Sequence, residues 1–163
     1  MRHSLLAAAL LTALVAGCKA EAPTAPAAST VPAAATAPQA EARFAELSKR
    51  WLEGWLPLNP VSATQIGDHR FDAELDDVSA AGRQRALEFS KKILAELDAI
   101  DSAALSRENQ VDAAILRNQL RGDIWSIETL QAWAWDPQGY NSLAGGAIYN
   151  LMAREFAPLP ERL

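Results

Sequence analysis

The chain has 163 residues, a formal net charge of −5 and a hydrophobic fraction of 50%. Proteins that bind nucleic acid usually present a basic surface, so this acidic balance argues against nucleic acid as a partner. The chain contains a single cysteine, which excludes an internal disulfide. Once a leader and a linker are set aside, the remaining length suffices for one domain.

Residues 1–17 have the pattern of a bacterial lipoprotein signal peptide. Arg2 precedes an apolar stretch of twelve residues, Leu5 to Ala16, and the sequence Leu-Val-Ala-Gly-Cys follows at 14–18. Twelve helical residues rise about 18 Å, too little to cross a hydrocarbon core of roughly 30 Å. We therefore predict cleavage before Cys18 and attachment to the membrane through lipid on Cys18. The alternative is an ordinary secretory signal followed by an unmodified cysteine.

Residues 18–40 are expected to form a disordered tether. They are rich in Ala, Pro, Thr and Ser, with prolines at 23, 26, 32 and 38. This composition cannot bury enough apolar surface to offset the entropy of ordering. Fully extended, the tether would reach up to about 65 Å from the bilayer. Lys19 follows the cysteine, and by resemblance to known sorting rules this favours the outer membrane, with the protein facing the periplasm.

Residues 41–163 show helical periodicity throughout and no strand-like alternation, which predicts an all-α fold of four to five helices. The first helix should end at Pro57, and a short one should run from Asn59-Pro60 to Gly67. A long helix should begin near Ser79. The apolar stripes expected on these long helices comprise Phe44, Leu47, Trp51, Leu52, Trp55 and Leu56, and then Ala86, Phe89, Ile93, Leu97 and Ile100.

A third long helix should begin at the capping residue Ser106 and continue to the break at Asp136-Pro137. Its predicted stripe comprises Val111, Ile115, Ile124, Ile127 and Leu130. A further helix is expected at about 143–153, and residues 158–163 look like the first turn of another. One isolated turn is unstable in water. We therefore expect the chain to be a fragment of a longer protein.

The sequence offers no set of zinc ligands. His3 leaves with the signal peptide and Cys18 is expected to carry lipid, which leaves His69 as the single imidazole. Residues 67–77 are the densest polar cluster, but position 77 is aspartate and position 83 is arginine where a calcium loop needs glycine and glutamate. We interpret the cluster as a loop between helices, and a substrate-facing or inter-domain role for Asp68, His69 and Arg70 is the alternative. An enzyme built on His69 and its neighbouring aspartates is a third hypothesis.

Five tryptophans give a second set of candidates. Trp51 and Trp55 lie on the predicted stripe of the first helix, where core packing is favoured over an aromatic platform for sugars or peptides. Trp133, Trp135 and Tyr140 flank the Asp136-Pro137 break and are expected to line a cleft. The Gly-Gly pair at 145–146 lacks the spacing of a nucleotide-binding loop, and we attribute it to close helix packing.

Three stretches together resemble the N-terminal signature of the DUF885 family of bacterial proteins. They are WLPLNPVSATQIGDHRFD at 55–72, LSRENQVD at 105–112, and AWDP at 134–137 followed by Tyr140 and Asn141. The similarity extends from about residue 43 to 163. It implies a longer, predominantly helical, often lipid-anchored protein that is similar to gluzincin-type zinc metallopeptidases. Their metal-binding helix has no counterpart here, so no catalytic or zinc-binding residue is transferred.

Two functional hypotheses follow. The first is a lipid-anchored N-terminal fragment, with residues 41–163 forming one wall of a peptide-binding channel. Zinc and catalysis would then belong to the complete family member, and no cofactor is expected in this chain. The alternative is a free-standing periplasmic helical lipoprotein that acts as a binding or interaction module.

Overall fold

The computed structural model describes residues 36–163. The predicted signal peptide, Cys18 and most of the predicted tether lie outside this range. The last four tether residues are helical, because the first helix begins at Ala37 and accommodates Pro38 in its first turn.

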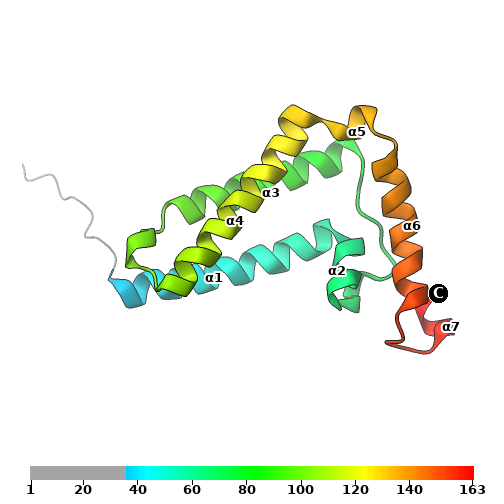
Figure 1. The fold of residues 1–163 in the computed structure, drawn as a ribbon, viewed down its shortest axis with the longest axis horizontal. Coiled ribbons are helices and arrows are strands. Elements are labelled where there is room, and N and C mark those ends of the chain that lie inside the picture. Colours follow the sequence, from blue (N-terminus) through cyan, green and yellow to red (C-terminus); the bar gives the residue numbers. More distant parts are fainter. Residues whose placement is uncertain (1–35) are drawn as a thin grey trace, which may run out of the picture. The chain divides into compact units, whose positions relative to one another are not determined.

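Within residues 36–163 the fold is all-α, as predicted, with seven α-helices of which five have seven residues or more. They are α1 (Ala37–Trp55), α2 (Pro60–Ile66), α3 (Ala80–Asp98), α4 (Arg107–Trp125), α5 (Ala132–Trp135), α6 (Gln138–Ala153) and α7 (Leu159–Arg162). Short 3₁₀ segments η1 (Leu56–Leu58), η2 (His69–Phe71) and η3 (Ser102–Ala104) connect them, and the π-helical segment η4 (Ser126–Leu130) follows α4 (Figure 1). No helix in this range combines the length and hydropathy that crossing a bilayer requires.

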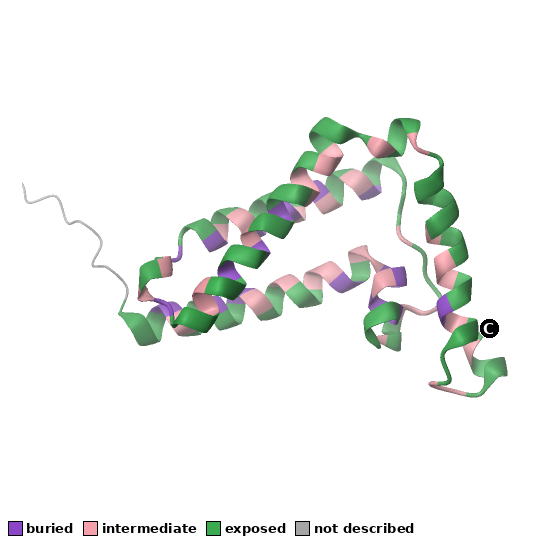
Figure 2. Cartoon of the chain, in the orientation of Figure 1, coloured by how far each residue is buried: buried purple, intermediate pink, exposed green. Residues whose placement is uncertain are grey.

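The main hydrophobic core lies between α1, α3 and α4. Its buried side chains are Ala40, Phe44, Leu47, Ile93, Leu97, Ile100, Leu105, Ala113, Leu116 and Leu120. Figure 2 shows buried residues on these three helices, whereas α6 is mostly exposed or intermediate. Arg50 of α1 and Glu96 of α3 form an ion pair of 2.7 Å beside this core. The predicted stripes on α1 and α3 therefore face the core in large part.

Close approach of α1 and α3 explains a glycine in the middle of α1. A Cβ atom at Gly54 would lie 2.4 Å from Cε2 of Phe89. Because that separation is far below van der Waals contact, only glycine leaves room for the Phe89 ring here. The conformational cost of a helical glycine is thus offset by packing.

The buried face of α4 differs from the prediction. Val111 and Ile115 are 42% and 63% exposed. The core instead receives Ala113, Leu116 and Leu120. Both sets have helical spacing, since α4 carries apolar residues on two faces and periodicity cannot choose between them. Packing against α1 and α3 selects the second set.

Both ends of α2 lie where the sequence predicts them, but different interactions stabilise the two ends. Gly67 ends α2 in the left-handed conformation, with φ of 94°, as expected of a C-terminal glycine. Asn59 occupies the N-cap position, but its side chain donates to the Trp55 carbonyl. The amide of Val61 donates instead to Oδ1 of Asp76 at 3.1 Å. A carboxylate fifteen residues away thus caps α2.

The helix that begins at Ser106 breaks earlier than predicted. It ends as an α-helix at Trp125, continues as the π-helical η4, and stops at Gln131. Gln131 has φ of 51°, a left-handed conformation that is uncommon for a residue with a side chain. The Asp136-Pro137 break therefore separates the short α5 from α6.

Candidate functional site

Arg70 joins the η2 segment to the end of α1. Its guanidinium donates to both carboxylate oxygens of Asp68, with Nη2 at 2.6 Å from Oδ2, and also reaches Glu53 of α1 at 3.3 Å. Hydrogen bonding to Arg70 lowers the pKa of Asp68, and hydrogen bonding to Asp68 and then Glu53 raises that of Arg70. Asp68 also accepts from the backbone amide of Arg70. These groups therefore satisfy one another and fix the loop.

His69 is held by Asp72 and by an aromatic ring. Its Nδ1 lies 3.0 Å from Oδ2 of Asp72, and its ring stacks on Phe156 with centroids 3.6 Å apart. The hydroxyl of the buried Thr64 donates to Oδ1 of the same carboxylate at 2.6 Å. Asp72 thus ties η2 to α2, while the His69 ring contacts the segment that follows α6.

This arrangement does not match a nucleophilic triad. A triad needs the nucleophile on one imidazole nitrogen and the carboxylate on the other. Here both Thr64 and His69 bond to the carboxylate of Asp72. The geometry supports the loop interpretation for His69 over a catalytic one.

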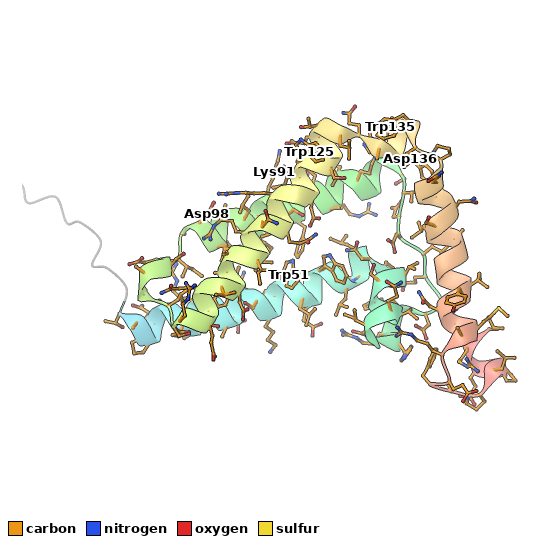
Figure 3. The ribbon with its side chains drawn as sticks, in the orientation of Figure 1. Trp51, Lys91, Asp98, Trp125, Trp135 and Asp136 are labelled. Carbon is orange, nitrogen blue, oxygen red and sulfur yellow. The ribbon has the colours of Figure 1, made fainter. Side chains whose placement is uncertain are left out.

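The other two candidates flank the α5–α6 break. Trp135 donates from Nε1 to the Leu130 carbonyl at 3.0 Å, and Tyr140 donates from its hydroxyl to the Trp133 carbonyl at 2.7 Å. Asp136 caps α6 by accepting from the Gln138 amide at 2.9 Å. Figure 3 shows Trp135 and Asp136 beside this break. Trp135 is 63% exposed and Tyr140 is 40% exposed.

The five candidates do not form one site. Tyr140 lies in the first turn of α6, whereas His69 stacks on Phe156 just beyond its end. The helix between them rises on the order of 20 Å. The charged group at 68–70 and the aromatic group at 133–140 are separate features of the surface.

Trp133 and Tyr140 line a cleft. The cleft has a volume of about 370 Å³ and is bordered by η1, the segment before α3, the start of α3, η4, α5 and the first turn of α6. Arg83 lies 3.9 Å above the Trp133 ring, and its Nη1 donates to the Val78 carbonyl at 2.5 Å. Trp135 is not among the residues that line it. The side chains at its rim include both acids and arginines.

Carboxylates at the cleft experience different surroundings. Hydrogen bonds from the hydroxyl and amide of Ser79, followed by one from Arg85, lower the pKa of Asp77 to about 2. Burial instead raises the pKa of Asp76, although the Val61 amide partly opposes this shift. Two adjacent acids therefore differ in proton affinity because one is exposed and paired while the other is half-buried.

A second, mostly apolar groove runs between α1 and α4. It has a volume of about 780 Å³ and is lined by Phe44, Ser48, Lys49, Trp51, Leu52, Trp55, Asp112, Ile115, Leu116 and Gln119. Trp51 and Trp55 are half-buried in it, with ring centroids 6.3 Å apart. Sequence patterning placed both rings in the core. The sequence feature that could have indicated this groove is the second apolar face of α4, which includes Ile115.

A gluzincin-type zinc centre needs several His and carboxylate ligands around one point. Among the described residues, no three His, Cys, Asp or Glu side chains gather closely enough to hold a metal ion. His69 has one carboxylate neighbour and an aromatic ring over its face. These residues therefore do not fit a gluzincin-type zinc centre.

Comparison with known proteins decides the family. Residues 60–163 match the family described as "Bacterial protein of unknown function (DUF885)". The chain belongs to the DUF885 family. Its match includes α2 to α7, and with them the five candidate residues and most of the cleft lining.

A solved structure shares this DUF885 fold. It is described as "a putative lipoprotein of unknown function from Shewanella oneidensis", with 32% sequence identity and a TM-score of 0.67. The similarity covers 73% of the present chain but 21% of the Shewanella chain. The DUF885 chain thus spans about a fifth of that protein. No curated protein shows significant similarity to the present chain.

Proposed function

We propose that this chain is the N-terminal helical portion of a lipid-anchored DUF885 protein with peptidase-like activity, and that it is inactive alone. The observation that carries the proposal is the family match over residues 60–163, together with a structural relative about five times longer than the matched region. Catalytic groups and zinc would lie outside residues 36–163. The described residues would act as scaffold.

Within that protein, the cleft beside Trp133 and Tyr140 would form part of a wall facing a peptide. Its combination of an aromatic ring, an arginine stacked on it and exposed acids suits a peptide backbone and mixed side chains. The chain supplies binding surface there and no nucleophile.

The proposed location is the bacterial cell envelope. The lipobox at 14–18 and the lipoprotein description of the Shewanella relative support attachment through lipid on Cys18. Lys19 favours the outer membrane with the protein facing the periplasm. Incorporation of radiolabelled palmitate into the wild type but not into Cys18→Ala would test the anchor, and membrane fractionation would test the location.

Two measurements test the proposal as a whole. The DNA downstream of the Leu163 codon should continue the DUF885 family, in frame or after one frameshift. The longer product should then hydrolyse peptides in a zinc-dependent manner, and the 163-residue chain should not. Stoichiometric zinc and peptide cleavage by the purified 163-residue chain would contradict the proposal.

The groove between α1 and α4 favours a second candidate, a free-standing periplasmic binding module. Its apolar lining and its volume of about 780 Å³ suit a ligand or the side of a partner helix. Cooperative unfolding of residues 41–163 expressed alone would favour this candidate. A molten, dye-binding product would favour the first.

A further inference from the structure

Helix α6 is uncharged along its whole length. From Pro137 to Ala153 the sequence contains no Asp, Glu, Lys or Arg. Surface helices of globular proteins carry a polar or charged face opposite their apolar one, whereas helices that are apolar all round are enclosed by other elements. α6 has no charged face of this kind, and its polar residues are Gln138, Asn141, Ser142 and Asn150 together with two tyrosines.

One side of α6 is covered within this chain and the opposite side is open. Asn150 is buried at 6% exposure, and α6 packs against α2. Ile148, Tyr149 and Met152 are 54%, 69% and 56% exposed. Together with the exposed Gly145 they have i, i+3, i+4, i+7 spacing, which places them on one face. We call these four residues the open α6 face.

The Gly145-Gly146 pair of α6 has open space around it. A Cβ atom added at Gly145 or Gly146 would meet nothing within 4 Å. The prediction that this pair serves close helix packing is therefore not met by any contact among residues 36–163. Small residues next to exposed Ile148 and Tyr149 would let another backbone approach α6 closely.

The end of α6 also carries unsatisfied polar groups. Arg162 caps the helix by donating to the Leu151 carbonyl at 2.9 Å, yet its Nε is buried without a partner. The buried Nδ2 of Asn150 has no partner among the described residues either. Such groups are rare in complete folded proteins because each costs free energy. Two of the three such atoms among residues 36–163 lie at this helix, and the third is Nε1 of Trp51 in α1.

From these observations we propose that the open α6 face is the surface against which the rest of a DUF885 protein packs. The occupant is the part of such a protein that corresponds to the four fifths of the Shewanella lipoprotein beyond the match. Its contacting surface would be apolar and uncharged, to match Ile148, Tyr149 and Met152, and would approach closely at Gly145. This inference rests on the proposed function in one respect: both assume that the functional protein is a longer DUF885 family member.

The first test uses the Shewanella lipoprotein. In its solved structure, the helix aligned with α6 should be covered, on the face aligned with Ile148 and Tyr149, by segments outside the matched fifth. Aspartates introduced into that protein at these two positions should lower its Tm by roughly 5 °C or more, because they bury unpaired charge. Solvent on that face, or an unchanged Tm, would overturn the proposal.

The second test uses the present chain with the same change. I148D/Y149D should leave its Tm within about 2 °C of the parent, because both side chains are exposed here. Val111→Asp, at an exposed apolar position on α4, serves as the matched control in the present chain. A large loss in the present chain would show that the face is already covered within it and would contradict the proposal.

Other occupants give distinct results. If light scattering shows that the chain is a dimer which I148D/Y149D converts to a monomer, the occupant is a second copy and the proposal fails. If the chain binds phosphatidylethanolamine–phosphatidylglycerol vesicles and I148D/Y149D abolishes that binding, the occupant is a lipid surface and the proposal likewise fails. Absence of peptidase activity in the Shewanella protein would count against the proposed function and leave the packing result unaffected.

Discussion

At the scale of single residues, neighbouring carboxylates have opposite electrostatic surroundings. Asp77 accepts hydrogen bonds from Ser79 and Arg85, and its pKa falls to about 2 from an ordinary value of 3.8. A group whose pKa is depressed on folding stabilises the native state above its unfolded pKa. That contribution is lost as the pH falls through the folded value. The stabilisation by Asp77 is therefore fully present near neutral pH and disappears between about pH 4 and pH 2.

The prediction for Asp77→Asn follows from this sign. The variant should have a lower Tm than the parent chain at pH 7, and the difference should shrink as the pH approaches 2. Thermal unfolding followed by circular dichroism across that range measures it. Glu74→Gln is a matched control, because Glu74 is an exposed acid that lines the same cleft. A difference for Asp77→Asn that stays constant with pH would refute the assignment.

A buried hydroxyl gives a second residue-scale prediction. Thr64 is 4% exposed and donates to Asp72, which also holds His69. Thr64→Val keeps the shape of the side chain but leaves one carboxylate oxygen short of a donor, so we expect a loss of about 1–2 kcal/mol in the free energy of unfolding. Urea denaturation measures it. His69→Ala should cost stability as well, through the lost stack on Phe156.

At the scale of elements, most helices could be predicted from the sequence, whereas the contacts between helices could not. Gly67, Ser79 and Ser106 each mark a helix boundary in the structure, because a cap acts through local backbone geometry. The buried face of α4 could not be chosen, since it carries two apolar faces. The cap that Asp76 provides for α2 could not be predicted from the sequence either, because the contact forms only after folding.

The residues of the candidate site could be predicted in part from the sequence. The aromatic residues around the α5–α6 break were expected to line a cleft, and Trp133 and Tyr140 do so. Trp135 was expected there too, but its indole turns back to the Leu130 carbonyl. Gln131, the residue before α5, has a left-handed backbone conformation that no local sequence pattern predicts.

Two glycines allow a matched test of helix packing. A Cβ atom at Gly82 would lie 2.0 Å from the Asp77 carbonyl oxygen, so Gly82→Ala requires the backbone before α3 to move. We expect it to destabilise the chain by about 1–3 kcal/mol, although alanine is the better helix former. Gly145→Ala meets no atom within 4 Å and should stabilise α6 by about 0.5–1 kcal/mol. Chemical denaturation of both variants compares them, and equal effects would show that propensity outweighs packing at Gly82.

At the scale of the whole molecule, stability should be uneven. The main core draws its buried residues from α1, α3 and α4 and from Ile100 and Leu105, which flank η3. Helix α6 contributes one buried residue, Asn150, and a largely exposed apolar surface. Elements with few buried apolar contacts open more readily than those in a core. The part of the chain within the DUF885 match thus includes two well-packed helices, α3 and α4, and one largely exposed helix, α6.

Hydrogen exchange resolves these two halves. Amides in the middle of α3 and α4 should exchange only through global unfolding, whereas those of α6 should exchange at least about tenfold faster through local opening. Mass spectrometry of the 163-residue chain measures both in one sample. In a longer DUF885 protein, where a further segment would cover the open α6 face, α6 should become as protected as α4. Equal protection of α4 and α6 in the short chain would mean that α2 alone holds α6 firmly, and that the exposed Ile148 and Tyr149 are tolerated at no cost to local stability.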